Sequence, residues 1–182
     1  MLALGQDVNQ TNMNTEDRIK FLTEALDLRK HPEGGYFKEV YRSKDIIPKS
    51  ALSPTFSGDR NCGTSIYFLL TSASFSSFHK IRQDETWHFY EGSSIALHVI
   101  SPEEAHSMVK VGSQLNAGDK YQFTVPAEHW FAAKIIEEDS YALVGCTVSP
   151  VFDFDDFTLG NRQELVSLYP EHSAIIESLT YP

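Results

Sequence analysis

Short stretches in which apolar and polar residues alternate fill the middle of the chain. They are rich in β-branched and aromatic side chains, which suit a pleated, half-buried surface. Turn-forming segments separate them, for example at residues 57–59 and 116–119. Many short strands divided by regular turns predict a β-sandwich or barrel rather than alternating βαβ units. The expected strands are residues 36–42, 64–70, 76–82, 85–91, 94–101, 107–111, 121–125, 132–136 and 141–148.

Helical periodicity flanks this β-rich region on both sides. Asn14 or Thr15 caps a helix that we expect to run to about Lys30, and Pro32 ends it. Near the C-terminus, Asn161 followed three residues later by a glutamate is a capping signature for a short helix. A second short helical stretch follows it. The predicted fold class is therefore mainly β, with an N-terminal helix and short C-terminal helices.

Length and composition change this picture little. The 182 residues suit one domain, and 41% hydrophobic residues can form a core. Residues 1–14 are polar and are expected to form a flexible arm, so that residues 15–182 form a single domain. The two cysteines, Cys62 and Cys146, allow one disulfide but are better interpreted as free thiols in a reducing compartment.

The charge of the chain bears on its partners. A formal net charge of -10 repels phosphate backbones and anionic lipid, so we expect neither nucleic acid nor membrane as a partner. No stretch approaches the roughly 18 apolar residues that cross a bilayer. The start of the chain lacks the basic region of a signal peptide. These features favour a cytoplasmic protein.

The most informative stretch for chemistry runs from residue 78 to residue 92. It reads as two strands joined by a tight turn, with His79 near the end of the first and Glu85 at the start of the second. Across such a turn both side chains can point into one cavity. Strand alternation places Glu85, Trp87 and Phe89 on one face and His88 on the other.

This stretch resembles the first motif of the cupin superfamily, in which a His-x-His pair is followed by a glutamate and a glycine. His79, Glu85 and Gly92 fit the spacing, but Ile81 replaces the second histidine. The second cupin motif is matched only at its proline, because Phe131 stands where its histidine is expected. Two of the four residues that would hold a metal are therefore present. We expect no tightly bound metal, and a weakly held ion at His79 and Glu85 stays open.

The whole chain is also similar to one cupin family, known as DUF985 or cupin-5, which is related to the nucleotide-sugar epimerases. The order and spacing of several segments carry this resemblance. It implies a jelly-roll barrel with a small-molecule pocket, usually in a homodimer, and no settled substrate. The polar arm and an edge strand at 36–42 give modest support for dimerisation. The matching segments are residues 31–36, 63–68, 84–90, 125–127 with 130–133, and 145–150 with 152–157.

General acid–base chemistry is the sharpest functional hypothesis. A histidine beside a carboxylate in an apolar cavity can transfer protons near neutral pH. The resemblance to sugar epimerases implies that His79 removes a proton next to a carbonyl, with Glu85 orienting it. Tyr67 or Tyr90 would return a proton from the other face. The alternative is that His79 and Glu85 simply hydrogen-bond to each other inside the barrel.

Several further residues are candidates for ligand contacts. Four aromatic side chains could form stacking walls for a sugar, or equally the ordinary core of a sandwich. The turn containing Gly34 and Gly35 ends a helix, and it could also let Glu33 or Tyr36 reach the pocket. His88 is a weaker candidate. The four aromatic residues are Trp87, Phe89, Trp130 and Phe131.

Three functions remain open at this point. The first is an epimerase- or isomerase-like enzyme that acts on a carbohydrate-like carbonyl compound. The second is a protein that binds a small ligand without chemistry, and the third and weakest is a metal-dependent cupin enzyme. An acidic segment at 152–157 has some of the spacing of a calcium loop, but Phe157 stands where an oxygen ligand is required. We therefore expect this segment to cover a barrel edge with its phenylalanines packed down.

Overall fold

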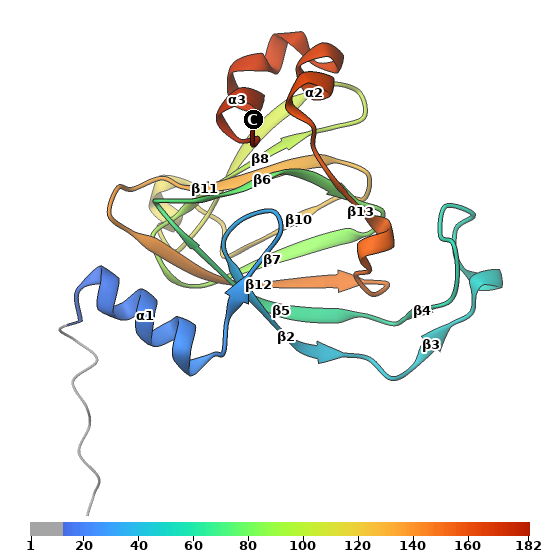
Figure 1. The fold of residues 1–182 in the computed structure, drawn as a ribbon, viewed down its shortest axis with the longest axis horizontal. Helices are drawn as coiled ribbons and strands as arrows, with labels where there is room; N and C mark the ends of the chain where they lie inside the picture. Colours follow the sequence, from blue (N-terminus) through green and yellow to red (C-terminus); the bar gives the residue numbers. More distant parts are fainter. Residues whose placement is uncertain (1–12) are drawn as a thin grey trace, which may run out of the picture.

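Two antiparallel β-sheets face each other in the computed structural model, which describes residues 13–182. Helices cover the outer side of each sheet, so the fold has four layers (Figure 1). The polar arm predicted for residues 1–14 lies almost wholly outside the described residues. The mainly β fold class with flanking helices is confirmed.

The elements follow one another along the chain in the expected order, with several additional short strands. They are α1 (Thr15–Ala25), β1 (Arg29–Lys30), β2 (Tyr36–Arg42), β3 (Ile46–Ile47), η2 (Lys49–Ala51), β4 (Arg60–Asn61), β5 (Thr64–Thr71), β6 (Phe75–Ile81), β7 (Asp84–Gly92), β8 (Ile95–Ile100), β9 (His106–Val111), η3 (Leu115–Ala117), β10 (Gln122–Val125), β11 (Trp130–Ile135), β12 (Tyr141–Ser149), η4 (Phe154–Asp156), β13 (Phe157–Leu159), α2 (Arg162–Leu168), η5 (Pro170–His172) and α3 (Ser173–Ser178).

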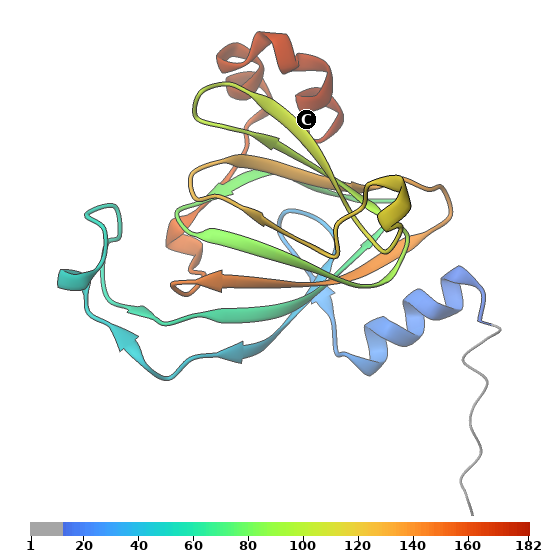
Figure 2. The same ribbon diagram turned by 180° about the vertical axis from the view of Figure 1, so that it is seen from behind.

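The order of the strands is that of a jelly roll rather than a series of hairpins. One sheet has the order β1-β2-β5-β12-β7-β10, and the other has the order β13-β6-β11-β8-β9. Strands β6 and β7 are joined only by Arg82 and Gln83, yet they belong to different sheets. The chain therefore crosses from one layer to the other at this turn, which decides where the candidate site residues lie. The short β3–β4 pair extends away from the sheets (Figure 2).

Apolar side chains from both sheets fill the space between them. Phe68 and Trp87 of the six-stranded sheet meet edge to face with ring centroids 5.6 Å apart, and both are almost fully buried. Leu97 and Phe131 project from the opposite sheet into the same cluster. Burying a side chain of this size contributes about 1.5–3 kcal/mol.

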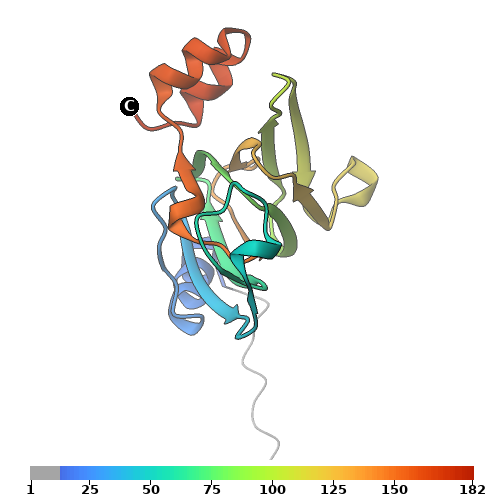
Figure 3. The ribbon, with the colours of Figure 1, turned by 90° about the vertical axis from the view of Figure 1, so that its right-hand side faces the viewer.

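The helices pack on the two outer faces, as the side view shows (Figure 3). Leu22 of α1 packs with Leu69 and Leu143 outside the six-stranded sheet. Leu165 of α2 and Ile176 of α3 pack outside the five-stranded sheet. No helix within residues 13–182 is both long enough and apolar enough to span a membrane.

Helix α1 ends at Ala25, several residues before the predicted end near Lys30. Asp27 adopts a positive φ of 52°, a left-handed conformation that interrupts the helix. The chain then enters β1, in which Arg29 pairs with Phe37 and Lys30 with Tyr36. The residues assigned to the end of the helix thus become an edge strand next to the cavity.

Candidate functional site

A cavity of about 290 Å³ lies against the inner face of the six-stranded sheet. Strands β2, β5, β7 and β12 form most of its wall, and β6 contributes from the opposite sheet. Aromatic and aliphatic side chains such as Phe37, Ile66 and Phe68 make its walls largely apolar. Its polar groups are concentrated in two buried sets, one around His79 and one at Glu85.

His79 is held rigidly on β6. Its Nδ1 atom lies 2.7 Å from the carbonyl oxygen of Ser77, which can only accept a hydrogen bond, so Nδ1 carries a proton. The imidazole packs against Phe131 with ring centroids 4.0 Å apart, and His79 is only 2% exposed. In the neutral ring the other nitrogen, Nε2, is therefore a bare acceptor.

That bare nitrogen faces Glu33. The Nε2 atom of His79 and the Oε2 atom of Glu33 lie 3.1 Å apart, and the other carboxyl oxygen of Glu33 accepts a hydrogen bond from the Ser76 hydroxyl at 2.9 Å. Two lone pairs facing each other at this distance would repel, so a proton lies between them. Because both groups are buried, the neutral arrangement is favoured, with the proton on Glu33.

Backbone geometry explains why Glu33 can reach β6. Gly34 and Gly35 have positive φ values of 114° and 70°, and a Cβ atom on Gly34 would lie 2.0 Å from the carbonyl oxygen of Phe75. Only glycine permits such a close approach. The Ser77 amide then donates to the Glu33 carbonyl oxygen at 2.8 Å, which fixes the loop across to the opposite sheet.

The electrostatics of this cluster favour uncharged groups. Burial lowers the pKa of His79 to about 3, against an opposing effect of the Ser77 carbonyl. Burial, reinforced by the nearby Glu85 carboxylate, raises the pKa of Glu33 well above its ordinary value. His31, which lies beside Glu33, has its pKa lowered to about 4 by burial. At neutral pH the cluster therefore consists of a carboxylic acid and two neutral imidazoles.

Glu85 lies on the opposite wall of the cavity, near the start of β7. Burial raises its pKa to about 7, although the Cys146 thiol and the Trp87 indole favour the carboxylate. The Nε1 atom of Trp87 is buried and makes no hydrogen bond of good geometry within the described part of the chain. Glu85 is thus about half ionised near neutral pH, which suits a group that both accepts and donates protons.

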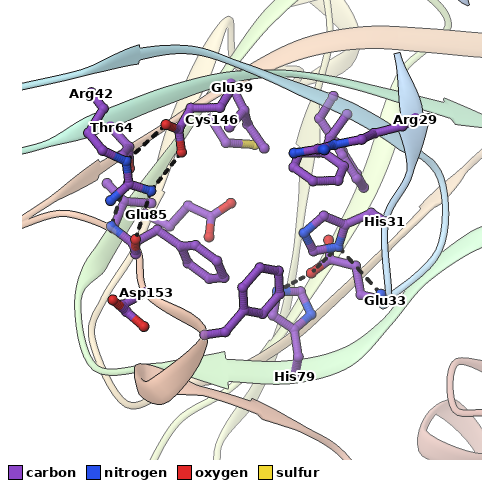
Figure 4. A pocket seen from close by; sticks show the side chains of 16 residues that line it. Arg29, His31, Glu33, Glu39, Arg42, Thr64, His79, Glu85, Cys146 and Asp153 are labelled. Atoms are coloured by element: carbon purple, nitrogen blue, oxygen red, sulfur yellow. Dashed lines mark hydrogen bonds and ion pairs between the residues drawn. The ribbon is translucent and has the colours of Figure 1, made fainter.

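The rim of the cavity carries the permanent charges. Arg42 forms two hydrogen bonds to the Glu39 carboxylate, at 2.9 and 2.7 Å. Asp153 lies on the same side, whereas Arg29 approaches from the side of His31 and Glu33 (Figure 4). The cavity therefore combines a charged rim with an interior whose polar groups are protonatable.

Three of the residues predicted from the sequence line this cavity, namely His79, Glu85 and Glu33. Their pairing differs from the predicted one, because His79 contacts Glu33 and not Glu85. The cause is the crossing between β6 and β7, which sets His79 and Glu85 on different sheets. The two residues face one cavity from opposite walls instead of forming a pair.

The structure places four other predicted site residues on the outer faces of the sheets. Tyr67 and Tyr36 pack beneath α1 in the cluster around Leu22, so neither reaches the cavity. His88 contacts the Thr147 hydroxyl at 3.2 Å on the solvent side of β7. Trp130 packs toward the C-terminal helices.

The remaining predicted aromatic residues belong to the core. Trp87, Phe89 and Phe131 pack in or against the cluster between the sheets and do not line the cavity. Two of them pack directly behind site residues: Trp87 lies next to Glu85, and Phe131 packs against His79. The aromatic walls come instead from phenylalanines that were not predicted to line the cavity, such as Phe37 on β2 and Phe154 in η4.

The residues present do not fit the metal that the two sequence motifs would hold. Ile81 and Phe131, at the positions of two histidines, are buried hydrocarbons in the core. Both nitrogens of His79 are already engaged, one by the Ser77 carbonyl and one by Glu33. Within residues 13–182 no group of three or more His, Cys, Asp or Glu side chains is arranged to hold a metal ion.

The acidic segment at 152–157 closes one end of the cavity. Asp156 is buried and receives hydrogen bonds from Nε and Nη2 of Arg60, both at 2.9 Å. Phe152 and Phe157 pack against the core as predicted, but Phe154 does not, since it is 55% exposed; Phe152 and Phe154 both line the cavity. The segment is therefore held in place by a buried ion pair.

Comparisons with known proteins agree with this architecture. The model of the family DUF985, which belongs to the cupin superfamily, matches residues 20–160. An uncharacterised protein of Saccharomyces cerevisiae is 34% identical over 167 residues, which cover 86% of this chain and 83% of the yeast protein.

Solved structures give the same result. A protein of Shewanella oneidensis superposes with a TM-score of 0.80 at 38% identity, covering 94% of this chain and 99% of that one. A hypothetical protein from Leishmania major gives a TM-score of 0.82 at 34% identity, covering 93% and 100%. Oxalate decarboxylase from Bacillus subtilis, at 12% identity and a TM-score of 0.51 over 84% of this chain and 37% of that one, shares the fold alone.

Proposed function

Because this chain belongs to the DUF985 family of the cupin superfamily, we propose that its cavity binds a small carbohydrate-like carbonyl compound and isomerises or epimerises it by proton transfer. One observation carries the proposal. Glu85 on one wall and the Glu33–His79 pair on the other are protonatable groups of different environments that line the same cavity. Such a separation of environments marks a proton acceptor and a proton donor.

The proposed roles follow from the protonation states. The ionised fraction of Glu85 removes a proton from the carbon next to the carbonyl group, and the electrons of the broken C–H bond pass into the carbonyl to give an enolate. Glu33, which is neutral, donates its proton from the opposite wall. Donation to the same carbon inverts its configuration. In an α-hydroxy carbonyl compound, donation to the former carbonyl carbon, with transfer of the hydroxyl proton of the deprotonated carbon to the enolate oxygen, moves the carbonyl to the deprotonated carbon. His79 acts as a positioning residue that holds the acidic proton of Glu33.

The size of the cavity limits the substrate. A volume of about 290 Å³ corresponds to about ten water molecules, at roughly 30 Å³ each. A single sugar ring or a short-chain keto compound fits this space. The proposed substrate class is therefore a free monosaccharide derivative or keto acid.

Solvent-deuterium incorporation tests the proposed chemistry directly. The protein is incubated in D₂O with D-fructose, D-ribulose, D-glucuronate and 2-oxobutanoate, and proton NMR follows the signal of the hydrogen next to each carbonyl. We expect the wild-type protein to exchange that hydrogen in at least one compound. Glu85→Gln is expected to slow the exchange about a hundredfold or more, since general acid–base catalysis contributes about 10²–10⁴. Glu177→Gln, an exposed carboxyl on α3 outside the cavity, is the matched control.

A second function, ligand binding without chemistry, is favoured by a specific observation. Ser76, Ser77 and His79 together engage the backbone and both carboxyl oxygens of Glu33, as expected of a purely structural cluster. Exchange that stays at the background rate for every compound that binds would contradict the enzyme and support the binding protein.

A further inference from the structure

Arg29 is a cation at the rim of the cavity that forms no ion pair within 4.0 Å among residues 13–182, although its charge, after the hydrogen bond and charge of Lys38, contributes to the lowered pKa of the exposed Asp27. It lies on β1 directly opposite Phe37, and its guanidinium carbon is 5.1 Å from the centroid of that ring. The nearest acid along the chain, Asp27, is instead paired with Lys38. The stacking on Phe37 holds the guanidinium in place and leaves its N–H donors available.

The other arginine of the cavity provides a contrast. Arg42 is paired through two hydrogen bonds with Glu39, and its Nη2 also contacts the carbonyl oxygen of Phe152 at 3.4 Å, so its charge is neutralised and three of its five N–H donors are engaged. Asp153 lies on the same side of the rim (Figure 4). One side of the rim is therefore neutralised or negative, and the Arg29 side is positive.

This asymmetry predicts how a ligand lies in the cavity. The protonatable groups Glu33 and Glu85 line the interior of the cavity and are only 6% and 8% exposed, whereas Arg29 is exposed at its rim. A ligand whose carbonyl reaches the interior extends its other end toward the rim. On the Arg29 side that end meets a planar cation, which binds a carboxylate through two parallel hydrogen bonds.

We propose that Arg29 is the anion-binding residue of the cavity and that the ligand is a small organic acid, namely a sugar acid or keto acid with one carboxylate. The carbonyl part of this assignment rests on the proposed function, but the carboxylate part does not. A carboxylate is favoured over a phosphate because, among the residues that the structure describes, only one guanidinium at the rim, that of Arg29, has no ion-pair partner. Glu39, Asp153 and the net charge of -10 also disfavour a dianion.

Binding measurements on matched pairs of compounds test this assignment. D-Glucuronate is compared with D-glucose, which carries an uncharged hydroxymethyl group in place of the carboxylate, and 2-oxobutanoate is compared with its methyl ester, by calorimetric or NMR titration. We expect each acid to bind about tenfold or more tightly than its uncharged partner, because a charge-assisted hydrogen bond contributes about 1.5–3 kcal/mol. Added salt should reduce this preference.

Variants assign the preference to Arg29. Arg29→Gln should remove the tenfold advantage of the acid and leave the weak binding of the uncharged partner unchanged. Arg29→Lys should keep part of the advantage, since it retains the charge but not the paired donors. Lys44→Gln removes one exposed positive charge elsewhere on the surface and should bind like the wild type.

Three outcomes would overturn the assignment. These are equal affinity for acids and their uncharged partners, a preference that survives Arg29→Gln, and tighter Arg29-dependent binding of D-glucose 6-phosphate than of D-glucuronate. Glu85→Gln separates this inference from the proposed reaction, because it should slow exchange about a hundredfold or more while acids still bind. Arg29-dependent binding without any exchange in the wild type would support the ligand class and reject the enzyme.

Discussion

The Nε2 atom of His79 lies 3.1 Å from the Oε2 atom of Glu33, a residue that the chain brings from a loop before β2. The Ser77 carbonyl fixes the proton of His79 on Nδ1, so the contact requires a proton on Glu33. An acid held in its neutral form on one wall, opposite a carboxyl of pKa about 7 on the other, is the feature from which the proposed chemistry follows.

Replacing Glu33 tests its protonation state. Glu33→Gln is isosteric with the neutral acid, since its amide can donate to His79 and accept from the Ser76 hydroxyl, so we expect a loss of less than about 1 kcal/mol in the free energy of unfolding. Glu33→Ala leaves both partners unpaired and should cost about 2–4 kcal/mol. Urea denaturation measures both. A large loss in Glu33→Gln would instead indicate an ion pair between a charged His79 and a charged Glu33.

The pKa of Glu85 predicts a pH dependence of stability. Its folded pKa of about 7 exceeds the unfolded value near 4.5, so the folded state binds more protons between these two values. The contribution of Glu85 to stability is therefore fully present below pH 4.5 and is lost as the pH rises through 7, by about 3 kcal/mol in total. Glu85→Gln should remove this loss. The difference in free energy of unfolding, Glu85→Gln minus wild type, should therefore rise between pH 5 and pH 8. A difference that did not change with pH would contradict the raised pKa of Glu85.

The buried ion pair at the cavity end makes Asp156 a sensitive position. Although burial raises the pKa of Asp156, hydrogen bonds from Arg60 and Gln83 bring it below its ordinary value. Asp156→Ala leaves the Arg60 guanidinium buried without its partner and should cost about 3–5 kcal/mol. The exposed neighbour Asp155 serves as the control, and its replacement by alanine should change stability by no more than about 0.5 kcal/mol. Thermal and urea unfolding measure both variants. If Asp156→Ala and Asp155→Ala lowered the free energy of unfolding equally, the ion pair between Arg60 and Asp156 would not contribute to stability.

Strand β2 is the expected contact in a homodimer. β1 pairs only with its first two residues, Tyr36 and Phe37, so the rest of this edge is open among the described residues. Val40 and Tyr41 on that edge are 51% and 57% exposed. We expect a species of dimer mass in sedimentation velocity, and a shift toward monomer in Val40→Lys, because edge strands pair readily. Leu168→Lys, on α2, is the control. A wild-type protein that sediments as a monomer would contradict this prediction.

The positions of the strands were predictable because side-chain alternation is a local property. The expected strand at 36–42 coincides with β2, and those at 64–70 and 85–91 agree with β5 and β7 to within one residue at each end. Alternation also indicates correctly that Glu85 and Trp87 share a face. Alternation cannot indicate which sheet a strand joins. The sequence therefore does not reveal that β6 and β7 belong to different sheets.

The candidate site was predictable only in part for the same reason. Glu33 owes its place to contacts with Ser76 and Ser77 far along the chain, although the two following glycines were a signal of close backbone approach. Tyr67 was assigned to the cavity on chemical grounds, but the cavity face of β5 carries Ile66 and Phe68 instead. Arg29 was not predicted as a cavity residue, because it lies in a segment that the sequence pattern assigned to the end of the first helix.

Carboxyl titration by NMR is the most direct test of the account. The side-chain carboxyl carbons of glutamate are labelled with ¹³C, and the signals of Glu33 and Glu85 are assigned by their loss in Glu33→Gln and Glu85→Gln. We predict that Glu85 titrates near pH 7 and that Glu33 stays protonated well above the ordinary glutamate range. If both carboxyls lost their protons near pH 4.5, like exposed glutamates, the cavity would hold no acid at neutral pH and the proposed proton transfer would be contradicted.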